Sequence, residues 1–345
     1  MIRFNNDYSE GAHPRILQRL ADMNAAQMAG YGEDTCCQAA ADLIRRRIGA
    51  PDAAVHFLVG GTQANLTVID AALRPHQGVL TADTGHIHTH ETGAVEACGH
   101  KVLALPSREG KLTAAQVEET CRLHWADASF EHMVQPKMVY LSFPTELGTL
   151  YSKAELAALR AVCDTYGLYL FLDGARLGYG LAAEGCDVSL ADLAALCDVF
   201  YIGGTKQGAL FGEAVVILNE ALKADFRYLI KQHGGMLAKG WLLGVQFEEL
   251  LKDDLYFDLA RHADRLADEL RGALRAKGVP FLVETPTNQV FPILPDGCLE
   301  ALGKEYTFTY YARADAKHSA VRFCTSWATR REDMAALITS IEKLT

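Results

Sequence analysis

Nearly continuous apolar runs constrain the fold of this chain more than any other feature. They lie near residues 138, 169, 199 and 214 of the 345-residue sequence, in a region where apolar runs alternate with helical patterns. A strand that is covered on both faces reads as an unbroken apolar run, and such strands belong to parallel sheets. The alternation therefore predicts an α/β fold, with a mostly parallel sheet that has helices on both faces.

Seven strands are expected between residues 54 and 218: Ala54–Val59, Gly78–Thr81, Lys101–Leu105, Met138–Phe143, Tyr169–Leu172, Val199–Ile202 and Ala214–Leu218. Two of the intervening helices have a readable start. Ser152 and Thr113 are each followed three residues later by the Glu or Gln of a capping box.

The pattern changes after residue 220. Helices with little strand character extend to about Ala276, and they include a periodic helix over Leu259–Ala276. Short strands then follow at Val279–Glu284, Gln289–Leu294 and Val321–Thr325. A capping box at Thr329 predicts the start of a terminal helix. We therefore expect an N-terminal arm over residues 1–30, a large domain over residues 31–245 and a smaller α+β domain over residues 246–345.

Composition and charge exclude several classes of protein. The net charge is −10 and no basic cluster interrupts it, which argues against a nucleic-acid partner. No apolar run approaches the roughly 20 residues that span a bilayer, and the N-terminus lacks the apolar core of a signal peptide. The nine cysteines are scattered without a C-x-x-C pair, so we expect a cytoplasmic protein with reduced thiols and no membrane partner.

Charged residues follow two of the expected strands where these should emerge from the sheet. Asp173 ends the run Leu170–Leu172, and Lys206 follows Gly203–Thr205 after the next strand. Open α/β sheets bind ligands at the carboxyl ends of their strands. A lysine that forms a Schiff base and a carboxylate that holds a pyridine nitrogen protonated are what pyridoxal 5′-phosphate (PLP) chemistry requires. A salt bridge between Asp173 and Arg176 is the alternative.

A glycine-rich turn follows the first expected strand. Gly60-Gly61-Thr62 precedes a helical pattern, so backbone amides and the helix dipole would hold a phosphate there. The turn is not a Walker loop, because the spacing G-x-x-x-x-G-K-[ST] is absent. An ordinary strand-to-helix turn is the alternative.

Three histidines alternate along the chain at His86, His88 and His90. On a strand this spacing would place three imidazoles on one face, so a zinc site in a metal-dependent hydrolase is one alternative. No Cys or His cluster elsewhere supplies obvious further ligands. In the PLP interpretation, His86 follows a strand exit and would stack over the pyridine ring.

Arg322 is a lone cation within the last apolar strand, Val321–Thr325. A guanidinium there suits bidentate binding of a substrate carboxylate. A structural salt bridge is the alternative.

Taken together, these stretches resemble the threonine aldolases, in the β-eliminating lyase branch of the fold-type I PLP enzymes. The most specific part of the resemblance is Asp-Gly-Ala-Arg at 173–176, followed about thirty residues later by Thr205-Lys206. The rest extends along nearly the whole chain: Asn6-Asp7, His13-Pro14, Gly30–Asp34, Gly60–Asn65, His86 with Glu91, Gly234–Met236 and Arg322–Thr325. The resemblance implies an aspartate-aminotransferase-like fold. It also implies retro-aldol cleavage of an L-β-hydroxy-α-amino acid, such as threonine or allo-threonine, to glycine and an aldehyde.

The resemblance assigns a role to each matching residue. Lys206 would carry the Schiff base, Asp173 would hold the pyridine nitrogen, and His86 would stack on the ring. Further cofactor contacts would come from Gly61, Thr62, Arg176, Thr205 and Lys239. The small amino-acid substrate would be held by Asn6, Tyr31, Arg176 and Arg322. Tyr31 and Lys239 would approach from a neighbouring subunit, since family members are homodimers or homotetramers with shared active sites.

The chain departs from the family pattern at one chemically important position. Family members commonly have a histidine, linked to the substrate's β-hydroxyl, after the strand that here reads Tyr140–Glu146, and this stretch has none. Glu146 and His90 are both candidates to replace it. The lysine and the aspartate would equally serve another PLP-dependent lyase or β-eliminase, or a transaminase, and that function is the alternative.

Overall fold

A mostly parallel sheet forms the centre of the protein. The computed structural model describes residues 1–344, and within them seven strands pair in the order β2-β8-β7-β6-β5-β3-β4. β8 runs antiparallel to both of its neighbours, whereas the pairs from β7 through to β4 are parallel. The strands are β2 Ala54–Leu58, β3 Gln77–Ala82, β4 Lys101–Leu105, β5 Gln135–Ser142, β6 Tyr169–Asp173, β7 Val199–Gly203 and β8 Glu213–Ile217.

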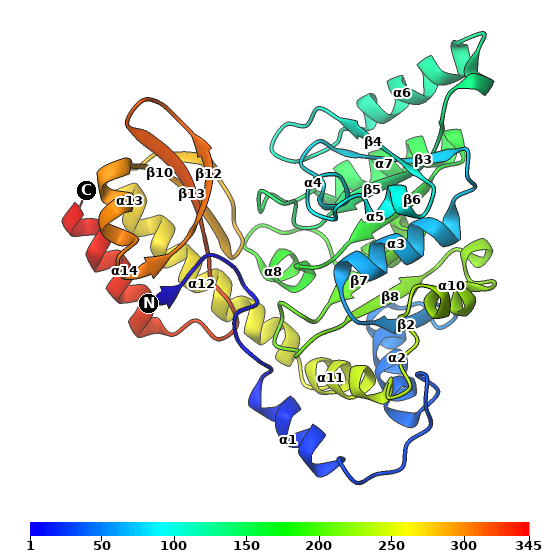
Figure 1. Cartoon of the computed structure of the whole chain (residues 1–345), viewed down its shortest axis with the longest axis horizontal. Coiled ribbons are helices and arrows are strands. Elements are labelled where there is room, and N and C mark those ends of the chain that lie inside the picture. Colours follow the sequence, from blue (N-terminus) through cyan, green and yellow to red (C-terminus); the bar gives the residue numbers. More distant parts are fainter. Residues whose placement is uncertain (345) are drawn as a thin grey trace.

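Both faces of this sheet are buried under helices, as the apolar runs predict (Figure 1). Alternate residues of β6 belong to different apolar clusters: Leu170 and Leu172 to one, Phe171 to the other. The first cluster includes residues of α2 Thr35–Ile48, α6 Ala114–Ala126, α7 Lys153–Tyr166, α9 Leu190–Leu196 and α11 Trp241–Leu251. The second includes residues of α3 Gly61–Ala72, α4 His86–Thr89, α5 Ala94–Ala97 and α10 Phe226–Gln232. The predicted α/β fold with a mostly parallel seven-stranded sheet is confirmed.

Both capping boxes predicted in this part of the chain are present. In α7, the Ser152 hydroxyl accepts a hydrogen bond of 3.2 Å from the Glu155 amide, and the Glu155 carboxylate accepts one of 2.7 Å from the Ser152 amide. Thr113 and Gln116 make the same reciprocal pair at the start of α6. Each pair satisfies backbone donors that a helix start leaves without partners.

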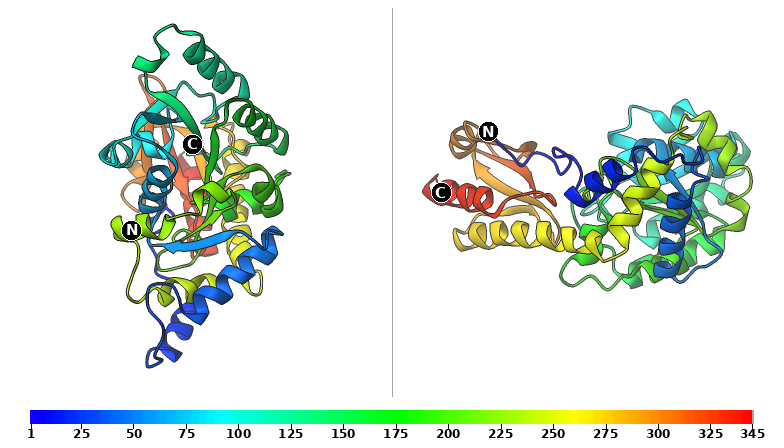
Figure 2. Two further views of the ribbon diagram at one scale, coloured as in Figure 1. Left: turned by 90° about the vertical axis from the view of Figure 1, so that its right-hand side faces the viewer. Right: turned by 90° about the horizontal axis from the view of Figure 1, so that it is seen from below.

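A second, antiparallel sheet lies apart from the first (Figure 2). Its order is β12-β13-β10-β9, and it packs with the long helix α12 and the terminal helix around the apolar core that contains Leu270, Val290 and Leu337. The elements are α12 Leu255–Ala276, β9 Phe281–Val283, β10 Gln289–Pro295, α13 Asp296–Leu302, β12 Thr309–Arg313, β13 His318–Cys324 and α14 Arg331–Leu344. The expected smaller α+β unit is therefore present.

Two details of this unit differ from the sequence-based expectation. β12 is an additional strand, which was not predicted because its residues are partly or fully exposed and form no apolar run. The predicted capping box at Thr329 is wrong: α14 begins at Arg331, and the Thr329 hydroxyl instead accepts a hydrogen bond of 2.7 Å from the Ser326 amide.

The N-terminal segment connects the two units. β1 Ile2–Arg3 pairs with β11 Tyr306–Thr307, and Phe4 lies in the core of the smaller unit. α1 Pro14–Asp22 then packs against α11 beside the large sheet. Short 3₁₀ helices at Phe130–His132 and Glu220–Leu222 complete the described elements, with α8 Leu177–Ala182 after β6. The domain boundaries expected at residues 30 and 245 stay predictions. Of the helices in residues 1–344, none is long and apolar enough to cross a membrane.

Candidate active site

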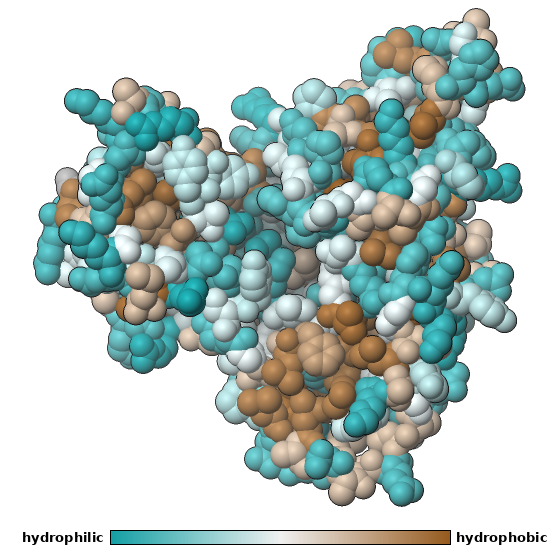
Figure 3. Space-filling view, viewed as in Figure 1, coloured by the Kyte–Doolittle hydropathy of each residue, from teal (hydrophilic) through white to brown (hydrophobic). Residues whose placement is uncertain are grey.

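A cavity of about 290 Å³ lies at the carboxyl ends of the parallel strands, and both Asp173 and Lys206 line it. A second hollow of about 600 Å³ shares Lys206 and Arg176 with it and extends to Arg322 in the smaller unit. Figure 3 shows a depression on this side, between the smaller unit and the large one. The cavity therefore lies at the edge of the sheet that the sequence analysis singled out, and the outer hollow extends from it to the smaller unit.

Close backbone approach brings the aspartate and the lysine together. A Cβ added at Gly174 would lie 1.9 Å from the Tyr201 carbonyl oxygen, and one at Gly203 would lie 2.5 Å from the Ala175 carbonyl oxygen. Only glycine fits such contacts, so β6 and β7 deliver Asp173 and Lys206 into one cavity.

Asp173 is a buried, ionised carboxylate. Its Oδ2 accepts hydrogen bonds from the Tyr140 hydroxyl and from Asn65 Nδ2 (3.2 Å), and its Oδ1 accepts one from the Ala175 amide (2.9 Å). Burial disfavours the charge, but the neighbouring His86 and these hydrogen bonds outweigh it and lower the pKa of Asp173. The alternative of a salt bridge to Arg176 is wrong, because the Arg176 guanidinium binds Asp7 instead.

Lys206 is half-buried among charges of both signs. Burial and the Arg176 charge lower the pKa of its amine, which favours the uncharged, nucleophilic form. Tyr179 holds the lysine backbone, donating a hydrogen bond of 2.6 Å to the Lys206 carbonyl.

Arg176 lies within an ion pair that sequence reasoning missed. Its Nε and Nη2 donate to the two carboxylate oxygens of Asp7 at 2.7 and 3.0 Å. Burial opposes ionisation of Asp7, but the Arg176 and Lys206 charges overcome it and lower the pKa of Asp7 to about 2. Asp7 belongs to the Asn6-Asp7 pair of the family resemblance, and that pair was the sequence feature that could have indicated its role.

His86 lies in the cavity at the start of α4. Its Nδ1 is 2.6 Å from Glu91 Oε1, and the same oxygen accepts a hydrogen bond of 2.6 Å from Asn65 Nδ2. Burial works against protonation, but the Glu91 hydrogen bond and the Asp173 charge raise the pKa of His86. The Glu91–Asn65–Asp173 contacts thus join the histidine to the aspartate in one buried network.

The expectation of three histidines on one face of a strand is wrong. His86–Thr89 forms a short helix, on which residues two apart do not face each other. His88 is exposed, while His90 lines the outer hollow with its ring centroid 5.6 Å from that of His86. Within residues 1–344, the grouping of side chains with metal-ligand spacing lies elsewhere and includes none of the three.

The glycine-rich turn opens α3, as predicted. Gly60 is the N-cap of this helix, Gly61 and Thr62 are its first residues, and all three line the cavity. Backbone N–H groups in a first turn have no intrahelical partner, so this end of α3 suits an anion. Thr205 also lines the cavity, but its hydroxyl donates a hydrogen bond of 2.9 Å to Glu213.

Glu213 is a site residue that the sequence analysis missed. It begins β8, lies in the cavity wall beside Lys206, and is buried. Burial raises the pKa of its carboxyl to about 8, although the Thr205 hydrogen bond and the Lys206 charge act in the opposite direction. A charged residue directly before the expected strand Ala214–Leu218 was the available signal.

Arg322 lines the outer hollow without a carboxylate partner. Its Nη1 donates to Gln289 Oε1 and its Nη2 to the Asn5 carbonyl, both at 3.2 Å, so both of these contacts are to neutral groups. In the described chain no ion pair involves Arg322, which argues against the structural salt bridge. Asn6 lies next to this contact, and its Oδ1 accepts from the Tyr8 amide and the Ser9 hydroxyl.

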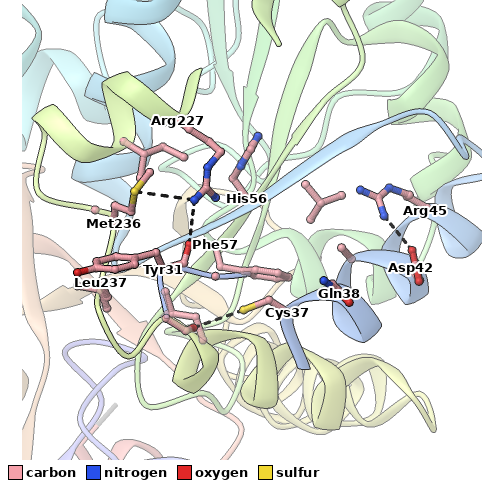
Figure 4. Close-up of a pocket in the computed structure, with 17 residues that line it drawn as sticks. Tyr31, Cys37, Gln38, Asp42, Arg45, His56, Phe57, Arg227, Met236 and Leu237 are labelled. Carbon is pink, nitrogen blue, oxygen red and sulfur yellow. Dashed lines mark hydrogen bonds and ion pairs between the residues drawn. The ribbon is translucent and has the colours of Figure 1, made fainter. Parts of the chain in front are cut away.

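Tyr31 and Lys239 lie away from the Lys206 cavity. Tyr31 lines a separate cavity of about 370 Å³, with Met236, Leu237 and Arg227 (Figure 4). Lys239 is exposed beside it, in the turn before α11. Among the described residues that line the Lys206 cavity, neither of the two is present.

The fold and this site define a class of protein. The sheet and the smaller antiparallel unit have the fold-type I architecture: aspartate aminotransferase of Thermus thermophilus superposes with a TM-score of 0.72 at 17% identity, over 100% of this chain and 92% of that one. The similarity at that identity concerns the fold alone.

The chain belongs to the β-eliminating lyase family, whose sequence model matches residues 7–336. It is 32% identical to the low specificity L-threonine aldolase of Pseudomonas aeruginosa, over 98% of this chain and 96% of that protein. A solved structure of Leishmania major threonine aldolase is 46% identical, with a TM-score of 0.97 over 100% of this chain and 99% of the other.

Proposed function

We propose that this protein is a PLP-dependent aldolase that cleaves L-threonine, L-allo-threonine and similar β-hydroxy-α-amino acids to glycine and an aldehyde. The Lys206 amine, whose pKa is lowered, and the ionised Asp173 in one cavity are the observation that carries the proposal. The similarity to threonine aldolases over nearly the whole chain supports the choice of reaction. Another PLP-dependent β-eliminase or a transaminase is the alternative that the assay below separates.

The residues of the cavity fit PLP. The buried, ionised Asp173 carboxylate would pair with the protonated pyridine nitrogen of the cofactor. A Cβ at Gly61 would lie 3.2 Å from the Tyr201 hydroxyl, so glycine leaves the start of α3 open to a phosphate. Lys206 and Asp173 would hold the cofactor, with Gly61 and Thr62 at its phosphate and His86 over its ring. PLP, when bound, supplies an electron sink for cleavage at the substrate Cα.

Two guanidinium groups would orient the substrate. Among the described residues, Arg322 donates to the neutral Gln289 side chain and the Asn5 carbonyl. Arg176 uses Nε and Nη2 to bind Asp7, so each guanidinium retains donors for a carboxylate. With the carboxylate fixed between them and Asn6 nearby, the bond to be broken is held in one orientation, which lowers the entropic part of the barrier.

Glu146 is the base that we assign to the β-hydroxyl proton. Its Oε1 accepts hydrogen bonds from the His86 amide (2.8 Å) and the Ser142 hydroxyl (2.6 Å), and neither of these bonds uses Oε2. Glu146 lines both parts of the cavity, and burial together with the Asp173 charge raises the pKa of its carboxyl, which makes the carboxylate a stronger base. His90 lies at the outer edge and is exposed.

The product assay tests the reaction. Purified protein with L-threonine should release glycine and acetaldehyde, whereas pyruvate and ammonia from serine or cysteine would indicate β-elimination. Lys206→Ala should abolish both the visible absorbance of the bound cofactor and turnover. Retention of both by this variant would refute the role of the lysine.

We also propose a homodimer, or a tetramer built from dimers, with shared active sites. Tyr31 (47% exposed) lies beside the cavity of Figure 4, and Leu17 and Leu210 are likewise large apolar residues with more than 40% of their surface exposed. Figure 3 shows apolar side chains gathered on the face where α1 and α11 lie. A patch of this kind marks an interaction surface.

The free state of all nine cysteines accords with the cytoplasmic location that we propose.

Mixing two inactive variants tests the shared site. Lys206→Ala and Lys239→Ala should each have little activity, and refolding them together should restore part of it, because each mixed dimer then contains one intact site. Absence of restored activity, or a monomer in light scattering, would contradict the arrangement.

A further inference from the structure

A cluster of metal-ligand side chains lies at the opposite end of α3 from the glycine-rich turn. Asp70 near the end of α3, Cys98 at the C-cap of α5 and His233 at the C-cap of α10 place their ligand atoms within 4.8 Å of one another. α3 packs against both of the other helices, and the three lie together at the right of Figure 1. Among the described residues that line the Lys206 cavity, none belongs to this cluster.

Two members of the cluster, Asp70 and His233, are held in place before any ligand arrives. His233 Nε2 is 2.8 Å from Asp70 Oδ2, and Gln63 of the same helix α3 donates a hydrogen bond of 3.0 Å to the His233 carbonyl. His100 Nε2 is 3.3 Å from the other Asp70 oxygen, Oδ1. His100 therefore orients the Asp70 carboxylate through Oδ1 and leaves Oδ2 for a metal. Hydrogen bonds of this kind commonly orient carboxylates that bind a metal.

We propose that Asp70, Cys98 and His233 bind a zinc ion, with His100 as a positioning residue for Asp70. One thiolate, one imidazole and one carboxylate are ligands that zinc accepts, with water in the fourth position, whereas Ca²⁺ and Mg²⁺ take oxygen ligands. Zinc–ligand bonds of about 2.0–2.3 Å place tetrahedral ligand atoms roughly 3.3–3.8 Å apart. The ligand atoms of the three side chains lie within 4.8 Å of one another, and small side-chain rotations would bring them to that range.

Zinc binding displaces protons from its ligands and involves no oxidation or reduction. The Cys98 thiol and any proton on His233 Nε2 leave as H⁺, and the ion forms bonds to the thiolate, the imidazole and Asp70. The ion would then join α3, α5 and α10, which are otherwise held by packing and hydrogen bonds. Because the first turn of α3 carries Gly61 and Thr62, the metal would fix the helix that supports the anion end of the active site.

Metal content is the first test. Tag-free holoenzyme is equilibrated with zinc, passed through metal-free buffer, and analysed by mass spectrometry for metals. We expect about one ion per chain for the wild type and none for Cys98→Ser or His233→Asn. His100→Asn should bind about 10–100-fold more weakly. His318→Asn is the matched control, since His318 also pairs with an aspartate, Asp315, in the smaller unit, and it should bind like the wild type.

Cysteine alkylation tests the same site without any variant. Cys98 and Cys186 are partly exposed, and the other seven cysteines are buried. Zinc should slow alkylation of Cys98 and leave that of Cys186 unchanged, as read by peptide mass spectrometry. The proposal is overturned if the wild type retains no zinc, if Cys98→Ser retains it, or if zinc leaves the Cys98 rate unaltered. Neither readout depends on aldolase activity.

Discussion

Glu213 shows how a single buried carboxyl can make stability depend on pH. Its ordinary pKa of 4.5 in the unfolded chain becomes about 8 in the folded protein, where Lys206 and Asp173 are its charged neighbours. The folded state therefore binds more protons than the unfolded state between these two values, so the free energy of unfolding should fall as the pH rises from about 4.5 to about 8. Urea unfolding of the apoenzyme across this range measures the slope.

Glu213→Gln isolates this contribution. Gln keeps the shape and the acceptor for Thr205 but cannot ionise, so the variant should lose the Glu213 part of the slope and gain stability relative to wild type above pH 8. The raised pKa of His86 gives a slope of the same sign in both proteins, and it cancels in the difference. Equal slopes for the two proteins would contradict the assignment.

Glu146→Gln tests the base for the β-hydroxyl. The amide retains an oxygen for Ser142 and the His86 amide but is not basic, so kcat should fall by about 10²–10⁴-fold while cofactor absorbance persists. The acidic limb of the pH–rate profile should disappear with it, because that limb reports ionisation of Glu146. His90→Asn is the matched control, and a larger loss in that variant would transfer the role to His90.

Residue types alone indicated the lysine and the aspartate, but not their partners. Asp173 and Lys206 were predictable because Asp173 ends the apolar strand β6 and Lys206 lies three residues after the end of the apolar strand β7. Asp7 and Glu213 were not predictable. Asp7 matters because it binds Arg176, which lies 169 residues away in the sequence, and Glu213 matters because it is buried beside Lys206. The cluster of Asp70, Cys98 and His233 was missed for the same reason, since 163 residues separate its ends.

At the scale of elements, the sequence predicted the strands and helices that are apolar and buried in the core. β7 matched its expected range to within one residue, because all five of its residues are buried. The half-exposed β12 carried no such signal, and His86–Thr89 alternates like a strand although it folds as a helix after Gly85. Short elements of this kind are determined by tertiary contacts rather than by their own periodicity.

Ser152→Ala tests the capping box of α7. Loss of the Ser152 hydroxyl leaves the Glu155 amide without its partner, so the free energy of unfolding should fall by about 1 kcal/mol. Ser129→Ala is the matched control: this exposed serine also precedes a helix, the 3₁₀ turn Phe130–His132, but its side chain makes no capping hydrogen bond. The control should change stability little, and an equal denaturation midpoint for the two variants would mean that the box contributes nothing measurable.

At the scale of the whole molecule, one side chain joins three parts of the chain. Asp7 of the N-terminal segment accepts hydrogen bonds from Arg176, beyond β6 of the large sheet, and from Asn288 Nδ2 (2.9 Å), just before β10 of the smaller unit. Asn288 also donates to the Thr325 carbonyl after β13. The arm therefore fixes how the smaller unit and the sheet edge meet around the cavity.

Asp7→Asn should thus destabilise the molecule far more than a typical surface change. The Arg176 side chain is only 13% exposed, and removing its carboxylate partner leaves a buried, uncompensated charge, which costs about 3–5 kcal/mol. Urea unfolding measures the loss, and Asp315→Asn, which removes an exposed partner of His318, should leave stability nearly unchanged. Because Asp7 also positions Arg176 toward the substrate side of the cavity, we expect KM for L-threonine to rise in Asp7→Asn. Wild-type stability together with wild-type KM would show that the arm does not organise the site.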